Sequence, residues 1–179
     1  ARYGMFSHRW IDMCQRHGLD VQVVECDWGT GAPADKFQAI LSEDTAHEIK
    51  AVMVTHNETA TGVLSDIGAV RKAMDSSDHP ALLFVDGVSS IACVPFEMDA
   101  WGVDVAVAGS QKGFMLATGM AILGVSQKAL SHMEEAELPR TYFAFRDMLN
   151  ANANGGFPYT PPLNLIYGLR ESLEMLFEE

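Results

Sequence analysis

Lys112 stands in a short polar segment between two apolar runs. Residues 109–113 read Gly-Ser-Gln-Lys-Gly, follow the apolar run 103–108 and precede a second one at 120–125. Ligands of α/β sheets bind outside the carboxyl ends of the strands, so this lysine lies where a ligand would be held. Partial burial there would lower the lysine pKa and leave some of its amine free to attack a carbonyl group. Lys112 is therefore a candidate for covalent catalysis, although an isolated Ser-Gln-Lys is more typical of a solvated loop.

Two further polar segments follow predicted strands. Residues 55–62 read Thr-His-Asn-Glu-Thr-Ala-Thr-Gly at the end of the strand 49–55, and Asp86 ends the apolar strand 81–86. If these strands are parallel neighbours, their polar ends converge with Lys112 on one edge of the sheet. Hydroxyls, a carboxylate and a lysine are what pyridoxal phosphate needs from a protein. The lysine forms a Schiff base, the carboxylate keeps the pyridine nitrogen protonated, and a hydroxyl hydrogen-bonds the phenolic oxygen. Without these partners, Asp86 could equally be a helix cap or a turn residue.

A competing cofactor signal lies near the amino end of the chain. Residues 29–34 read Gly-Thr-Gly-Ala-Pro-Ala and fit the pattern G-x-G-x-x-A, which can bring a helix N-terminus to a pyrophosphate. However, residues 25–28 separate this segment from the preceding predicted strand, and Pro33 lacks an N–H group where a phosphate would need one. We interpret the segment as a loop that leads into a helix. A non-catalytic nucleotide-binding or interaction module on the same sheet remains the alternative to an enzyme.

The composition indicates one globular domain without nucleic-acid or membrane partners. The chain has 179 residues, of which 48% are hydrophobic and 20% charged. Its net charge of −12 would repel nucleic acid and anionic membranes, and no apolar run approaches the ~20 residues of a membrane helix. Cys14, Cys26 and Cys93 lack C-x-x-C spacing and suit free thiols in the cytoplasm. Because the chain begins at Ala1 and ends at Glu179 within a helical pattern, we expect a piece of a longer protein.

Strands and helices alternate along most of the chain. This alternation predicts an α/β fold with a mostly parallel sheet and helices on both faces, in three layers. The expected strands are 21–25, 49–55, 81–86, 103–108 and 120–125, and the expected helices are 10–17, 33–41, 65–74, 126–137, 140–152 and 160–176. The last two strands are joined by too few residues for a crossover helix, so the final strand should be antiparallel. We expect Ser65 and Thr160 to cap their helices, with Pro161 and Pro162 in the first turn of the last one and Leu163 facing inward.

Several segments together resemble one known family. Residues 56–63 (His-Asn-Glu-Thr-Ala-Thr-Gly-Val), 83–90 (Leu-Phe-Val-Asp-Gly-Val-Ser-Ser) and 109–113 resemble class V aminotransferases, which are pyridoxal phosphate enzymes of fold type I. Residues 157–161 (Phe-Pro-Tyr-Thr-Pro) and 167–173 (Tyr-Gly-Leu-Arg-Glu-Ser-Leu) are similar to the serine–glyoxylate branch in particular. The resemblance covers essentially the whole chain, and several motifs in order are far more specific than any single one.

The resemblance implies an activity. The expected reaction transfers the amino group of L-serine to glyoxylate and gives hydroxypyruvate and glycine. The alternatives within the family are alanine–glyoxylate transfer and a lyase or desulfurase activity. Desulfurases of this group favour a histidine immediately before the lysine, where this chain has Gln111. Gln111 therefore disfavours the desulfurase alternative.

The resemblance also assigns roles around the cofactor ring. It makes Lys112 the Schiff-base lysine, Asp86 the partner of the pyridine nitrogen and Thr59 the ligand of the ring oxygen. Val88 would pack on one face of the ring. Phe6 lies where the family places an aromatic side chain that stacks on the other face, although it could also be a plain core residue.

Two further residues are assigned to the cofactor phosphate. Gln111 would touch the phosphate, and Thr160 matches a threonine that reaches the phosphate of the neighbouring subunit's cofactor in the family dimer. A homodimer with shared active sites is therefore expected. Residues 1–179 would form part of the large cofactor-binding domain. The phosphate-binding loop, the substrate-carboxylate arginine and the small domain would lie elsewhere in the longer protein, so this piece alone should be inactive.

Overall fold

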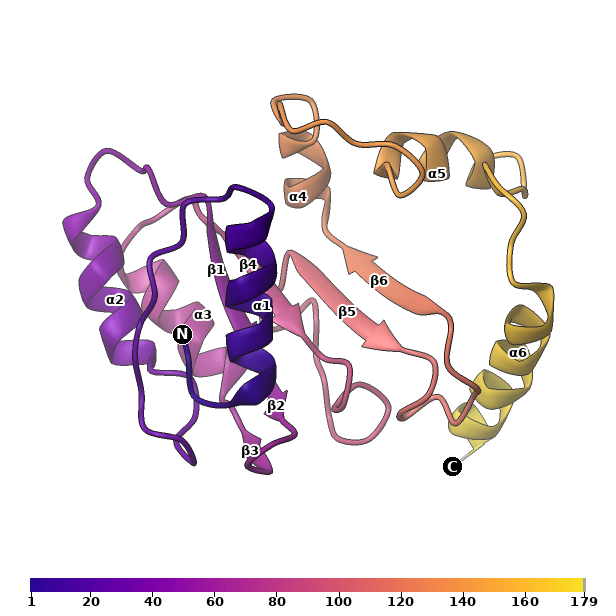
Figure 1. Ribbon diagram of the computed structural model, residues 1–179, viewed down its shortest axis with the longest axis horizontal. Coiled ribbons are helices and arrows are strands. Elements are labelled where there is room, and N and C mark those ends of the chain that lie inside the picture. Colours follow the sequence, from indigo (N-terminus) through magenta and orange to yellow (C-terminus); the bar gives the residue numbers. More distant parts are fainter. Residues whose placement is uncertain (179) are drawn as a thin grey trace.

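The structure is a computed structural model that describes residues 1–178. Two helices precede the first strand, and three helices follow the last one (Figure 1). They are α1 (Met5–Arg16), α2 (Ala34–Glu43), β1 (Ala51–Thr55), β2 (Asn57–Glu58), β3 (Val63–Leu64), α3 (Ile67–Ser76), β4 (Leu82–Asp86), β5 (Val105–Gly109), β6 (Ala121–Val125), α4 (Gln127–His132), α5 (Phe145–Asn152) and α6 (Leu163–Glu178).

The main sheet has the strand order β1-β4-β5-β6. β1, β4 and β5 are parallel, whereas β6 runs antiparallel to β5, which confirms the mostly parallel sheet and its single antiparallel strand. In the register, Thr55 lies opposite Asp86, and Asp86 lies opposite Val107. The carboxyl ends of the three parallel strands therefore meet at one edge of the sheet, where polar residues follow each strand.

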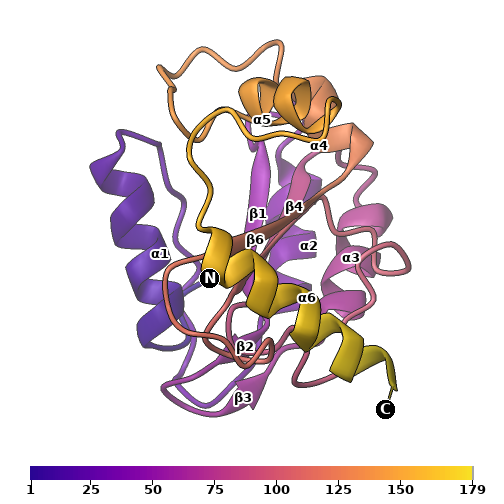
Figure 2. The ribbon, with the colours of Figure 1, turned by 90° about the vertical axis from the view of Figure 1, so that its right-hand side faces the viewer.

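Helices cover both faces of this sheet. In Figure 2 the strands lie between α1 on one side and α2 and α3 on the other, so the predicted three-layer arrangement is confirmed. Apolar side chains of β1 and β4 interdigitate with one face of α2 and of α3, because the apolar residues of these helices recur at helical spacing. The buried members of this core are Phe37, Leu41, Val52, Val54, Ile67, Val70, Met74, Ala81, Leu83, Val85, Val103 and Ala106.

The first predicted strand is wrong. Residues 21–25 do not join the sheet; instead, Glu25 forms an isolated bridge with Arg2, whose backbone N–H donates to the carbonyl of Val24 at 2.8 Å. The alternating apolar pattern suited a strand, but the extended segment pairs only with the short N-terminal segment. Conversely, the small β2–β3 hairpin was not predicted, because each of its strands has two residues and carries no periodic pattern.

Two predicted helix caps are also wrong. The N-cap of α3 is Asp66, whose carboxylate accepts the Ala69 N–H at 2.8 Å. Ser65 instead donates its hydroxyl to the Thr55 carbonyl at 3.2 Å. Thr160 does not cap α6, which begins only at Leu163. The reason is the Pro-Pro pair before Leu163, since a proline disfavours helical geometry at the residue that precedes it.

The helices after β6 are shorter than predicted. α4 ends at His132 and α5 begins at Phe145, with Pro139 in the segment between them. Ser126 caps α4 by accepting the Ala129 N–H at 3.0 Å. Leu163, which was expected to face inward, is 55% exposed at the first turn of α6.

Candidate active site

Side-chain hydrogen bonds join the β2–β3 hairpin to the turn after β4. The Thr59 hydroxyl donates to Ser89 Oγ at 2.9 Å, and the Asn57 side-chain amide donates to the same oxygen at 2.9 Å. A second contact between the same segments joins His56 Nδ1 and Ser90 Oγ, which are 2.9 Å apart. The structure therefore places Thr59 beside the turn that begins at Asp86.

Asp86 carries a carboxylate that has no cationic partner among the described residues. It ends β4, is half-buried, and accepts the Val88 N–H at 3.0 Å through Oδ1. Burial raises the pKa of Asp86, the negative charge of Glu58 raises it further, and the Val88 N–H opposes both. Among residues 1–178 no ion pair includes Asp86. A cation placed against this carboxylate would therefore be stabilised.

The segment that carries Lys112 is a tight loop held from inside by Ser110. The fully buried Ser110 donates its N–H to the Met120 carbonyl at 3.0 Å and its hydroxyl to the Ala117 carbonyl at 2.7 Å. The Met115 N–H donates to the Lys112 carbonyl at 2.9 Å and closes a turn. These bonds fix the loop backbone at the end of β5 and so fix the origin of the lysine side chain.

The surroundings of Lys112 differ from the sequence-based prediction in one respect. Lys112 and Gln111 are exposed, so the partial burial expected for the lysine is wrong. The loop lies at the rim of the sheet, and the glycines on either side have no side chains that could cover Lys112.

Both glycines of this loop lie where a side chain would meet neighbouring atoms. A Cβ at Gly113 would collide with the backbone of Ile91 and Ala92, so Gly113 permits close packing of the lysine loop on the β4–β5 connection. A Cβ at Gly109 would lie 3.2 Å from the Val88 side chain and 2.9 Å from Gln111 Oε1. Gln111 and Val88 therefore both lie against the end of β5.

Phe6 lies in the first turn of α1, and its backbone contacts Glu58, the residue before Thr59. Its ring is 39% exposed, and the Arg9 guanidinium lies 5.8 Å from the ring centroid. α1 is tied to the sheet by Tyr3, whose hydroxyl donates to the Thr55 carbonyl at 2.6 Å and accepts the Thr55 N–H at 2.8 Å. The Phe6 N–H donates to the carboxylate of Glu58. Sequence reasoning missed the roles of Tyr3 and Glu58, because both depend on contacts between distant segments.

The family follows from a match over nearly the whole chain. Residues 4–179 match the family model for class-V aminotransferases. The chain belongs to the class V aminotransferases. The resemblance read from the sequence is therefore confirmed, and with it the dependence of this family on pyridoxal phosphate.

Relatives and solved structures agree with this membership. The chain is 64% identical to the L-aspartate–glyoxylate aminotransferase of Paracoccus denitrificans. The alignment covers all of this chain and 45% of that relative. The chain is 61% identical, again over its full length, to 46% of the serine–glyoxylate aminotransferase of Methylorubrum extorquens. The crystal structure of the ureidoglycine–glyoxylate aminotransferase of Bacillus subtilis superposes with a TM-score of 0.88 at 25% identity, over 99% of this chain and 46% of that one. The chain thus spans about half the length of these relatives.

The donor set fits the cofactor of class V aminotransferases. Asp86 supplies a carboxylate at the end of β4, and Lys112 supplies a primary amine in the loop that follows β5. Thr59 supplies a hydroxyl in the β2–β3 hairpin, where it is hydrogen-bonded to Ser89 of the turn after β4. Val88 and Phe6 supply apolar groups on the turn after β4 and on α1. By contrast, residues 1–178 hold no cluster of three or more His, Cys, Asp or Glu side chains arranged for a metal ion. Within the same residues, no helix is long and apolar enough to cross a membrane.

Thr160 lies apart from the other six predicted residues. It is exposed in the linker between α5 and α6, beside a stacked pair of rings, Tyr142 and Tyr159, whose centroids are 4.5 Å apart. Within residues 1–178 no hydrogen bond joins Thr160 to the loop that carries Lys112. The structure of one chain therefore brings together Phe6, Thr59, Asp86, Val88, Gln111 and Lys112, but not Thr160.

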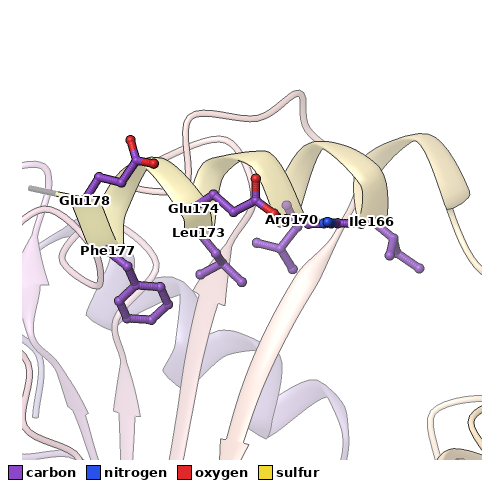
Figure 3. Close-up of a pocket in the computed structure, with 7 residues that line it drawn as sticks. Ile166, Arg170, Leu173, Glu174, Phe177 and Glu178 are labelled. Atoms are coloured by element: carbon purple, nitrogen blue, oxygen red, sulfur yellow. Dashed lines mark hydrogen bonds and ion pairs between the residues drawn. The ribbon is translucent and has the colours of Figure 1, made fainter.

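Helix α6 supports the lysine loop and also carries an exposed groove. The buried Ser172 donates its hydroxyl to the Phe114 carbonyl at 2.7 Å, which anchors the helix to the loop. A neighbouring face of α6 is lined by Ile166, Leu173 and Phe177 (Figure 3), and the Phe177 side chain is 85% exposed. One face of α6 therefore fixes the loop of Lys112, whereas another presents apolar side chains at the surface.

Proposed function

We propose that this chain provides most of the cofactor-binding site of an aminotransferase that uses glyoxylate as amino acceptor and L-serine as amino donor. The observation that supports this proposal is the parallel pairing of β4 and β5, which places Asp86 and the loop of Lys112 at one edge of the sheet, together with the hydrogen bond from Thr59 to Ser89 in the turn after β4. The similarity to two glyoxylate-using relatives over the whole chain supports the acceptor. The products would be hydroxypyruvate and glycine.

Three residues of the chain have distinct roles in the proposed reaction. Bound pyridoxal phosphate supplies an electron-accepting ring that stabilises negative charge on the substrate Cα. Lys112 attaches the cofactor through its amine and, once released, carries the proton between the substrate Cα and the cofactor C4′. Asp86 holds the proton on the pyridine nitrogen. Thr59 turns its hydroxyl from Ser89 to the ring oxygen.

Three contacts position the cofactor. Val88 and Phe6 pack on opposite faces of the ring, which limits its tilt relative to Lys112. Gln111, beside the end of β5, donates its side-chain amide to the phosphate. We also propose that residues 1–179 form part of the large domain, and that the phosphate-binding loop and the substrate-carboxylate arginine come from other parts of the longer protein.

A spectroscopic cycle tests the proposed reaction in the full-length protein. Added pyridoxal phosphate should produce a visible absorbance band, L-serine alone should bleach it with release of hydroxypyruvate, and glyoxylate should restore it with release of glycine. A nucleotide-binding or interaction module would show no such band. Absence of the band in the reconstituted full-length protein would refute the proposal, and a band that serine leaves unchanged would refute the donor.

L-Aspartate is the second candidate donor, because one relative at 64% identity carries aspartate in its name. Single-turnover bleaching rates with serine, aspartate and alanine would rank these donors. Equal rates would refute the serine preference. A lyase or desulfurase remains less suited to the loop, since Gln111 stands where desulfurases carry a histidine.

We propose further that the working unit is a homodimer in which Thr160 serves the partner's site. The exposed Thr160 and the apolar groove of α6 support this arrangement, because large exposed apolar surfaces typically mark interfaces. All three cysteines are free thiols, which supports a location in the cytoplasm.

Mixed dimers test whether the sites are shared. Subunits with Lys112→Ala and subunits with Thr160→Val should each be defective at limiting cofactor. A hybrid of the two contains one site with both an intact lysine and a partner threonine, so random mixing should restore about a quarter of the wild-type sites. If Thr160 acted only within its own chain, mixing would restore no activity, and sedimentation velocity would show whether hybrids had formed.

A further inference from the structure

Glu58 is a fully buried carboxylate at the end of helix α1. Its relative exposure is 0%, and it lies in β2, one residue before Thr59. It accepts the Phe6 N–H at 3.1 Å and the Ser7 N–H at 2.9 Å, and the Ser7 hydroxyl donates to it at 3.0 Å. A helix leaves its first N–H groups without internal partners and carries a partial positive charge at this end. Glu58 accepts two of these N–H groups of α1 and places a carboxylate at the positive end of the helix.

The same carboxylate also binds the turn that follows it. The Ala60 N–H donates to Glu58 Oε1 at 3.2 Å, so one side chain holds segments that are 52 residues apart. Gly4 is required for this contact, because a Cβ at that position would collide with the Glu58 side chain. A buried charge is costly unless its hydrogen bonds are satisfied. The geometry of both segments is therefore strongly constrained by the carboxylate.

We propose that Glu58 is a positioning residue for the cofactor ring, which fixes Phe6 and Thr59 relative to each other and so sets the space that receives the ring. This inference rests on the proposed roles of Phe6 and Thr59. Glu58 itself does not touch the cofactor in this proposal, since its oxygens are occupied by α1 and by the turn after β2. Its effect travels through two short backbone connections, from the Phe6 N–H to the ring of Phe6 and from Glu58 to the adjacent Thr59.

The variant Glu58→Gln tests this role in the full-length protein. The amide keeps the volume and one acceptor oxygen, but its NH₂ group opposes backbone N–H donors of α1. We expect the dissociation constant of pyridoxal phosphate to rise about tenfold and the visible circular dichroism band of the bound cofactor to weaken. If Glu58 acted only through its charge, the substitution would tighten cofactor binding instead. Loss of that charge would lower the pKa of Asp86 and favour the ionised carboxylate that the cofactor needs.

Asp104→Asn is the matched control. Asp104 is also a buried carboxylate, accepting the Leu83 N–H at 2.9 Å and the Ser126 hydroxyl at 2.8 Å, but it lies at the amino end of β5. Both variants should lower the melting temperature, whereas only Glu58→Gln should change the cofactor dissociation constant and the dichroism band. Equal changes in both variants, or no change with Glu58→Gln, would overturn the inference.

Two further variants keep the test decisive. If Glu58→Gln does not fold, Ser7→Ala is the second variant, because it removes one hydrogen bond to the Glu58 carboxylate. It should weaken cofactor binding about threefold. An unchanged dissociation constant of pyridoxal phosphate in Ser7→Ala would then overturn the inference. Lys112→Ala separates this inference from the proposed function. If Lys112→Ala loses the visible band while Glu58→Gln keeps the wild-type cofactor dissociation constant, only the positioning role is refuted. If the band persists in Lys112→Ala, the proposed function is refuted.

Discussion

Replacement of Lys112 by alanine is expected to abolish covalent attachment of the cofactor and to lower kcat on the order of 10⁴-fold, because one amine acts as both nucleophile and proton carrier. Borohydride treatment followed by mass spectrometry would measure attachment directly. The wild-type full-length protein should gain the mass of the reduced cofactor on the peptide that contains Lys112. The variant should gain none.

The structure offers two controls for this experiment. Lys128 donates to the Ala81 carbonyl at 3.0 Å, at the start of β4 and away from the carboxyl edge, so Lys128→Ala should retain attachment and most of the activity. Lys112→Arg keeps the positive charge but removes the nucleophilic amine, so it should behave like Lys112→Ala. Attachment that persists without Lys112 would show that another lysine holds the cofactor, and wild-type turnover in the variant would exclude lysine as the proton carrier.

The loop around Lys112 also explains why loss of the amine should leave the fold intact. Ser110 makes its hydrogen bonds through its own backbone and hydroxyl, and Ser172 anchors the loop through the Phe114 carbonyl. The Lys112 side chain takes part in none of these contacts among residues 1–178. A loss of activity in Lys112→Ala can therefore be attributed to chemistry once circular dichroism shows an unchanged fold.

The site residues at strand ends could be predicted because their signal is local. A buried parallel strand is a continuous apolar run, and the polar residue that ends it is visible in the sequence, as with Asp86 after residues 81–85. The antiparallel last strand was also predictable, since its connection is too short for a crossover. By contrast, residues 21–25 carry the pattern of a strand but find no place in the sheet.

The supporting contacts could not be predicted because they join distant segments. Glu58 looked like one polar residue among several in a loop, and only the fold shows that its carboxylate enters the first turn of α1. The exposure of Lys112 depends on how its loop lies at the edge of the sheet. The start of α6 at Leu163 depends on the Pro-Pro pair, which prevents Thr160 from capping the helix. Local sequence therefore predicted which polar residues follow the strands, whereas tertiary contacts decide how these residues are held.

Asp86→Asn is expected to have opposite effects on catalysis and on stability. The asparagine can still accept the Val88 N–H, so the turn after β4 should persist. It cannot neutralise a protonated pyridine nitrogen, and we expect kcat to fall about 10²–10³-fold, as when a preorganised electrostatic contact is removed. The apoprotein should become more stable toward urea, because the variant no longer buries a carboxylate without a cationic partner.

The pH dependence of the stability gained by Asp86→Asn distinguishes the effect of the Asp86 charge from other effects of the substitution. Burial raises the pKa of Asp86 in the folded protein, so the wild-type carboxyl costs stability above that pKa and costs none below the unfolded value. The stability difference between Asp86→Asn and wild type should therefore be largest near neutral pH, should decrease as the pH falls below the folded-state pKa of Asp86, and should disappear below the unfolded-state value.

Asp104→Asn should behave in the opposite way, because the Asp104 carboxylate accepts hydrogen bonds from Leu83 and Ser126 that the fold uses. We expect that substitution to destabilise the apoprotein without affecting turnover per bound cofactor. A destabilised Asp86→Asn apoprotein would show that the Asp86 charge is compensated in the fold, and an unchanged kcat would exclude Asp86 as the partner of the pyridine nitrogen. Gain of stability with loss of turnover would instead mean that Asp86 is kept, at a cost to the fold, for the cation that the cofactor brings.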